Sequence, residues 1–219
     1  MNWQSILISL PGILLGLTIH EYCHALAAFK LGDTTARDQG RLTLNPLKHI
    51  DIIGFVFIIM AGFGWAKPVQ FNPHNLRNYR RDKAIIAAAG PLSNLILALL
   101  FIASIRGLIA LLNSDSAVRN FPFLVSTNFV FFVIMIYQAT IINLGLFIFN
   151  LLPLPPLDGS HIFLSGLNLS PETELRIMKI GAPVLFIIIL VQNWTRINIL
   201  PIRSAVSAML KFFIPEIEY

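Results

Sequence analysis

The sequence predicts an all-α integral membrane protein, a bundle of about four to six helical segments with a small re-entrant or extended β element. Of its 219 residues, 56% are hydrophobic and only 12% are charged, whereas soluble domains carry about 25% charged residues. The mean hydropathy is +0.73. Four apolar stretches approach or exceed the roughly 20 residues that a helix needs to cross the hydrocarbon core. They lie at residues 4–30, 84–112, 121–152 and 177–195, and the chain length suits a single membrane-embedded domain over residues 1–219.

The first stretch, residues 4–30, is predicted to stay in the protein as a membrane helix. It lacks the basic start of a signal peptide and is longer than the apolar region of one. If the helix runs from outside to inside, position 20 lies roughly 24 Å along it from residue 4, at 1.5 Å per residue. That places position 20 toward the cytoplasmic half.

The connection between residues 30 and 83 is the most polar part of the chain and carries more Lys and Arg than Asp. By the positive-inside rule we expect it on the cytoplasmic side. The apolar run 52–63 interrupts it, but about 12 residues are too few to cross the membrane. We therefore expect a re-entrant or interfacial segment beside the site, flanked by short extended pieces at 40–44 and 65–71.

The second half of the chain is predicted to leave the membrane once and return. The helix at 84–112 exits, 113–120 is external, and 121–152 comes back. Three prolines at 153, 155 and 156 then forbid a regular helix, because each lacks a backbone donor. The broken segment ends at Asp158, and a broken helix with an acid at its end is a common way to build a site inside a membrane. A last apolar run, 197–214, contains Arg203 and Lys211 and is expected to span or to lie at the interface.

The charge distribution and the cysteine content argue against nucleic-acid binding and against an internal disulfide. The net charge is +5, but the charges lie in short loops and not on a continuous basic face, so they are topology signals and no nucleic-acid partner is expected. Cys23 is the only cysteine, which rules out an internal disulfide. The simplest interpretation of Cys23 is a small buried residue.

The first apolar stretch contains an HExxH motif at residues 20–24. A carboxylate at the centre of a membrane helix costs about 2.5–3.5 kcal/mol on insertion scales, so such groups are normally paired, hydrated or metal-bound. His20 and His24 share one helix face and can direct their imidazoles at one ion. In HExxH metalloproteases the glutamate, here Glu21, takes a proton from water acidified by zinc. The motif therefore predicts one Zn²⁺ per chain.

A catalytic zinc usually has three protein ligands, so one ligand remains to be found. Asp158 is the best candidate, because it is the only acid between Asp115 and Glu172 and follows the proline-broken run. His161 is the runner-up. His49 and His74 lie among polar neighbours and are expected at the interface.

With these motifs the chain resembles the site-2 proteases, peptidase family M50, and in particular their compact bacterial members. The resemblance covers nearly the whole chain. It implies His20, His24 and Asp158 as zinc ligands, Glu21 as the catalytic acid and base, and Asn94 and Asn150 as candidates for positioning substrate or stabilising the oxyanion. The matching segments are HExxH at 20–24, GRLTLNP at 40–46, GWAKPV at 64–69, GPLSN at 90–94 and the run from Asn150 to the LDG at 157–159.

The resemblance implies hydrolysis of peptide bonds in or near transmembrane segments of membrane-protein substrates, as in regulated intramembrane proteolysis. The apolar stretches predict a multi-pass protein of the cell membrane, and the loop charges predict that its active site lies toward the cytoplasm. No segment is long enough for a PDZ or CBS domain, so we expect regulation to come from the bundle or from other proteins. A substrate helix must unwind locally, and 40–44 or 65–71 is expected to offer it a strand edge. Gly90 and Pro91 are interpreted as packing residues that supply a preset first turn.

Two other functions are compatible with the same sequence. A membrane metal-ion transporter or channel would use His20, Glu21, His24 and Asp158 as an ion pathway. A catalytically inactive scaffold would bind membrane proteins without cutting them.

Overall fold

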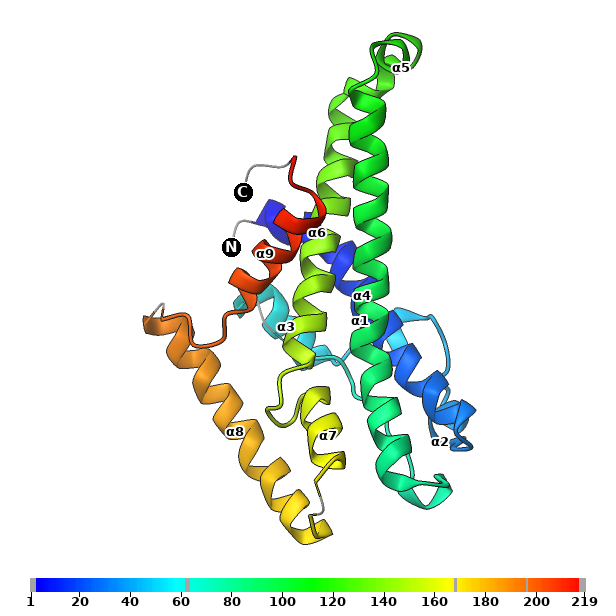
Figure 1. The fold of residues 1–219 in the computed structure, drawn as a ribbon, viewed down its shortest axis with the longest axis vertical. Coiled ribbons are helices and arrows are strands. Elements are labelled where there is room, and N and C mark those ends of the chain that lie inside the picture. The colour runs from blue at the N-terminus through cyan, green and yellow to red at the C-terminus, as the bar shows by residue number, and fades with distance from the viewer. Residues whose placement is uncertain (1–2, 62–63, 168, 196, 217–219) are drawn as a thin grey trace.

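The computed structural model describes residues 3–61, 64–167, 169–195 and 197–216. It confirms an all-α membrane protein built from packed helices (Figure 1). Within the described residues three helices are long and apolar enough to cross a membrane: α1 (Trp3–Lys30), α4 (Tyr79–Leu112) and α6 (Thr127–Asn150). The shorter helices are α2 (Thr35–Asp38), α3 (Ile52–Ala61), α5 (Asp115–Asn120), α7 (Asp158–Ser165), α8 (Pro171–Thr195) and α9 (Ile202–Phe213), with 3₁₀ turns η1 (Pro46–Lys48), η2 (Pro73–Asn75) and η3 (Pro122–Val125).

Helices α1, α4 and α6 pack against one another and form the centre of the molecule. Gly12 and Gly16 lie one turn apart on the face of α1 that meets α6. A Cβ on Gly12 would lie 2.7 Å from the Cα of Ala139, and one on Gly16 would lie 2.9 Å from Oδ1 of Asn143. Small residues allow helix backbones in membranes to approach closely. This contact fixes the rotation of α1, and with it the direction of the HExxH side chains.

Helices α4 and α6 form a long hairpin with α5 at its tip (Figure 1). Helix α4 begins at Tyr79, earlier than predicted, because the Asn78 side chain accepts from the amide of Arg81 and caps the helix. Helix α6 begins at Thr127, later than predicted, because the preceding residues form η3 and Ser126 caps α6. Pro91 lies inside α4, so the predicted first-turn role for it is wrong.

The connection from α1 to α4 folds back beside α1. Asp33 is fully buried and accepts hydrogen bonds from the backbone of Thr35 and Asn72 and from the side chains of Thr35 and Asn75. Burial by itself raises the pKa of Asp33, but these hydrogen bonds outweigh it and lower the pKa below its usual value. The carboxylate therefore ties the end of α1 to η2.

The predicted extended pieces are present only in part. The β contact in the described residues is one antiparallel bridge between Ile50 and Ala66. The amide of Lys67 also donates to the His49 carbonyl, and the Arg41 guanidinium donates to the Lys67 carbonyl. Residues 40–44 turn through bends instead of extending. Only 65–71 runs as an open, nearly extended segment, held at one end by these contacts.

The last two helices differ in part from the expectation. Helix α8 contains the predicted 177–195 but is not among the three candidate spans. Its apolar stretch 180–191 is about 18 Å long, against a hydrocarbon core of about 30 Å. The run 197–214 forms α9, whose 12 residues also cover only about 18 Å. Val206 and Leu210 of α9 pack on α4 and α6 beside Ile102 and Leu144, which favours the interfacial alternative.

Candidate metal centre

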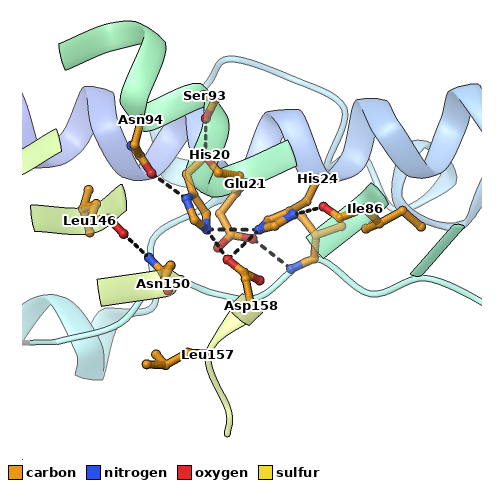
Figure 2. Close-up of polar contacts among 12 residues, drawn as sticks. His20, Glu21, His24, Ile86, Ser93, Asn94, Leu146, Asn150, Leu157 and Asp158 are labelled. Carbon is orange, nitrogen blue, oxygen red and sulfur yellow. Dashed lines mark hydrogen bonds and ion pairs between the residues drawn. The ribbon is translucent and has the colours of Figure 1, made fainter. Parts of the chain in front are cut away.

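Three side chains of types that can bind a metal ion converge on one point from two helices far apart in the sequence (Figure 2). His20 and His24 lie one turn apart on α1, with their Nε2 atoms 3.0 Å from each other. Oδ2 of Asp158, the first residue of α7, lies 3.1 Å from Nε2 of His20 and 3.3 Å from Nε2 of His24. All three ligand atoms lie within 4.8 Å of one another, and both histidines are buried.

Each imidazole is oriented by a hydrogen bond at its other nitrogen. Nδ1 of His20 lies 2.6 Å from Oδ1 of Asn94, and Nδ1 of His24 lies 2.6 Å from the carbonyl oxygen of Ile86. Both oxygens can only accept, so each Nδ1 carries the proton and donates. In a neutral imidazole the Nε2 atom then bears the lone pair. The two Nε2 lone pairs therefore face each other and the Asp158 carboxylate.

This donor set fits a zinc ion. Two facing lone pairs cannot form a hydrogen bond with each other, and a cation between them removes the repulsion. Ligand atoms about 2.0–2.1 Å from a tetrahedral zinc are roughly 3.3 Å apart, close to the spacings found here. Outer hydrogen bonds at Nδ1 are also the usual support of zinc-binding histidines. Two histidines and one carboxylate leave the fourth position of such an ion free.

Helix α4 provides one of these supporting hydrogen bonds. Pro91 lies inside this helix, where it has no amide proton to donate to the Ala87 carbonyl. One residue before Ala87, the Ile86 carbonyl accepts from Nδ1 of His24. Gly90 faces the two imidazoles, and a Cβ on it would overlap Nε2 of His24 and Cε1 of His20. The chain thus needs glycine at position 90 for the rings to reach their places.

Asp158 is positioned by the proline-broken segment that precedes it. Leu157 keeps an extended backbone conformation and α7 starts at Asp158. Gly159 lies so close to the Leu151 and Leu152 carbonyls that a Cβ would overlap them. Its Oδ2 atom points at the two Nε2 atoms, at 3.1 Å from His20 and 3.3 Å from His24. The segment therefore places a carboxylate oxygen among the candidate ligand atoms.

Glu21 lies beside the metal ligands and lines a cavity of about 330 Å³ together with them. It is buried, and its Oε2 accepts from the backbone amide of Val69 at 3.0 Å. The nearly extended segment 65–71 thus forms one wall of the cavity. No backbone hydrogen bond to Oε1 is found among the described contacts. Oε1 is therefore the carboxylate oxygen that can accept a proton from a molecule in the cavity.

The structure separates the two candidate asparagines. Asn94 is fully buried, and its Nδ2 donates to the Gly16 carbonyl at 3.1 Å and to Oδ1 of Asn143 at 2.9 Å, while its Oδ1 holds His20. Its amide has no free donor and supports the metal ligand instead of facing substrate. Asn150 lines the cavity and donates one hydrogen bond, to the Leu146 carbonyl at 3.0 Å. Its remaining amide atoms are available to a ligand.

The other histidines and the cysteine lie outside the three-residue ligand group of the described residues. His161 lines the cavity, one turn after Asp158, and burial followed by the nearby Lys83 charge lowers its pKa to about 4. His49 is buried within the protein, with Nε2 2.7 Å from the Thr43 carbonyl oxygen. His74 is exposed on η2, and Cys23 is half-buried.

Sequence reasoning missed Lys83 and Asn143 as parts of this region. Lys83 is buried, lines the cavity and forms an ion pair with Glu174 of α8. Asn143 of α6 is fully buried and accepts from Asn94. Polar side chains inside apolar helices were the available signal, since such residues usually face the protein interior and pair there.

Comparison with known proteins finds a matching family and relatives that are named as zinc metalloproteases. The family described as "Peptidase family M50" matches residues 118–192, which include Asp158. The protein named "Putative zinc metalloprotease YwhC" from Bacillus subtilis is 45% identical over 155 residues, covering 68% of this chain and 64% of its own length. "Putative zinc metalloprotease Rip2" from Mycolicibacterium smegmatis is 34% identical over 174 residues, covering 77% of this chain and 60% of its own.

The chain thus spans less than two thirds of the length of these curated relatives. No solved structure matches it. The likeness to known proteins rests on sequence alone.

Proposed function

Because this chain belongs to peptidase family M50, the family of the site-2 proteases, we propose that it is an intramembrane zinc metalloprotease. It hydrolyses peptide bonds in or near the transmembrane segments of membrane-protein substrates. The observation that supports this most strongly is the convergence of His20, His24 and Asp158 in one cavity with Glu21. This set unites a zinc-binding group and an acid–base group at membrane depth.

In this proposal His20, His24 and Asp158 hold the zinc ion. When bound, zinc supplies Lewis-acid chemistry, because it polarises a carbonyl group and acidifies water. Asn94 and the Ile86 carbonyl keep the protons of His20 and His24 on Nδ1, and so keep both Nε2 atoms available.

Glu21 moves the proton. The Val69 amide holds its Oε2, so Oε1 is the atom that accepts a proton from water as the water oxygen attacks the scissile carbonyl carbon. The same carboxyl group then returns the proton to the leaving amine nitrogen when the C–N bond breaks. Asn150 positions the substrate backbone from the cavity wall, and segment 65–71 offers main-chain groups to an unwound substrate.

The site is proposed to open toward the cytoplasm of a multi-pass protein. The polar, Lys- and Arg-rich connection from α1 to α4 lies at the same end as the site, since Val69 within it contacts Glu21. By the positive-inside rule this end is cytoplasmic. Cytoplasmic water would then reach the cavity without crossing the membrane.

Replacing Glu21 by Gln tests this function. The variant keeps the three metal ligands, so its zinc content should equal that of the wild type, but it has no carboxylate to accept a proton. Cleavage of a membrane-protein reporter in proteoliposomes should fall by at least about 100-fold. Glu172→Gln, at an exposed carboxylate on α8, is the matched control and should cleave normally.

Retained proteolysis in Glu21→Gln would refute the proposed mechanism. Zinc-dependent ion flux through the same liposomes without proteolysis would refute the protease assignment in favour of a transporter.

A further inference from the structure

His161 is a cavity residue that neither metal binding nor proton transfer employs. It lies on α7, three residues after Asp158, so both side chains project from the same face of that helix. It lines the same cavity as Glu21 and the metal ligands. The ligand group found among the described residues is complete without it.

One ring nitrogen of His161 is buried without a partner. Its Nδ1 has no hydrogen bond within the part of the chain that the structure describes. An unpaired buried N–H group is rarer in proteins than an unpaired buried acceptor, so the proton belongs on Nε2. His161 therefore holds its N–H group at Nε2, for which the described residues show no acceptor, on a ring that borders the cavity.

The donors of Lys83 and Asn94 are already engaged, and those of Asn150 are engaged in part. The Lys83 ammonium lines the cavity too, but it is paired with Glu174. Both amide hydrogens of Asn94 are donated within the protein, and Asn150 donates one of its own to the Leu146 carbonyl. Among the cavity-lining side chains described, His161 is thus a donor whose hydrogen-bonding capacity is unused.

We propose that His161 is a further catalytic residue, which donates a hydrogen bond from Nε2 to the scissile carbonyl oxygen of the substrate. This inference rests on the proposed protease function. As the water oxygen bonds to the carbonyl carbon, the π electron pair moves onto the carbonyl oxygen and Glu21 takes the water proton. His161 transfers no proton, and its N–H stabilises the charge on that oxygen until the C–N bond breaks. Removing one such donor typically lowers kcat by about 10²–10³-fold.

Two variants of His161 test this role. His161→Leu removes the donor, and His161→Gln retains an amide N–H of similar reach. For a reporter cleaved in proteoliposomes, His161→Leu should lower kcat about 100-fold while KM and zinc content stay within about twofold of the wild type. His161→Gln should recover part of the loss. His74→Leu, at an exposed histidine on η2, should leave all three quantities unchanged.

A second measurement does not need turnover. A peptide phosphinate, whose tetrahedral group carries two oxygens, should bind His161→Leu about tenfold more weakly than the wild type, with His161→Gln in between. Wild-type kcat in His161→Leu, an effect on KM alone, unchanged phosphinate affinity, or loss of zinc would each overturn the inference. Failure of the wild type to cleave any reporter would instead count against the protease function, and phosphinate affinity would still test His161.

Discussion

At the scale of single residues, the site depends on groups that orient the two candidate histidine ligands from the side opposite their Nε2 atoms. Asn94 and the Ile86 carbonyl each take the Nδ1 proton of one histidine, and Gly90 leaves room for both rings. None of the three touches the point where the ligand atoms meet. Their effect is to select the tautomer and the angle of each imidazole, which is how outer groups tune a metal site.

Gly90→Ala should weaken zinc binding by at least about tenfold, the low end for loss of a supporting contact. The new Cβ would overlap both imidazoles, which cannot retreat without losing their bonds at Nδ1. Zinc affinity of the purified protein, measured by competition with a chelator, checks this. Gly107→Ala lies on the same helix and meets open space, so it should bind zinc normally. Equal affinities for the two variants would contradict this role of Gly90.

Asn94→Ala should lower zinc affinity about 10–100-fold, because it leaves Nδ1 of His20 and Oδ1 of Asn143 unpaired in a buried place. Asn150→Ala is the matched comparison. Asn150 lines the cavity but bonds no ligand, so this change should spare zinc binding and reduce cleavage. The same competition titration and the proteoliposome assay separate the two outcomes. If both variants bound zinc equally well, Asn94 would not be a supporting residue.

At the scale of elements, one face of α8 contacts both the start of α4 and the segment around Asp158. Glu174 pairs with Lys83, Met178 lies 3.8 Å from the Ser160 hydroxyl, and Leu185 packs with Leu157. Gly181 of the same face lies against the ring of Pro155. Spacings of three or four residues put all of these on one helix face. Helix α8 therefore supports the segment that carries Asp158, although it stands apart from the three long helices (Figure 1).

The Lys83–Glu174 pair should hold α8 to α4. Lys83→Met leaves the Glu174 carboxylate without its cation, and we expect a loss of about 2 kcal/mol, below the value for a fully buried pair because Glu174 is partly exposed. The midpoint of thermal unfolding in detergent measures it. Lys179→Met, at an exposed lysine of α8, should have little effect. The double variant Lys83→Met with Glu174→Leu should lose less stability than Lys83→Met alone. A larger loss, equal to the sum of the two single losses, would exclude the pairing.

At the scale of the whole molecule, the candidate centre joins two segments that lie far apart in the chain. His20 and His24 come from the first helix, and Asp158 comes from α7 after the long α4–α6 hairpin (Figure 1). An ion at this point would cross-link α1 to α7 directly. The fold around it stays assembled through α1, α4 and α6, whose mutual packing does not involve the ion.

Removing zinc with a chelator should therefore lower the unfolding midpoint without unfolding the protein at room temperature. A ligand present at 1,000 times its Kd stabilises the folded state by about 4 kcal/mol. Differential scanning fluorimetry with and without chelator, followed by zinc addition, measures the shift. His24→Ala lacks one ligand and should show a much smaller shift. If neither chelator nor zinc changed the unfolding midpoint of the wild type, the result would argue against a resident ion.

The sequence by itself determined the all-α membrane class and three of the long helices, because apolar length and composition are local properties of the chain. It also identified residues 20–24 and Asp158 as candidate site residues, because the spacing of a motif along one helix and a run of prolines can both be recognised in the sequence. Tertiary structure decided what these residues meet. Only packing turned Asn94 from a substrate candidate into the partner of His20, buried His49, placed Gly90 against two imidazoles and paired Lys83 with Glu174. The reason is physical: such contacts join helices far apart in the chain, and their formation depends on how each helix is rotated against its neighbours.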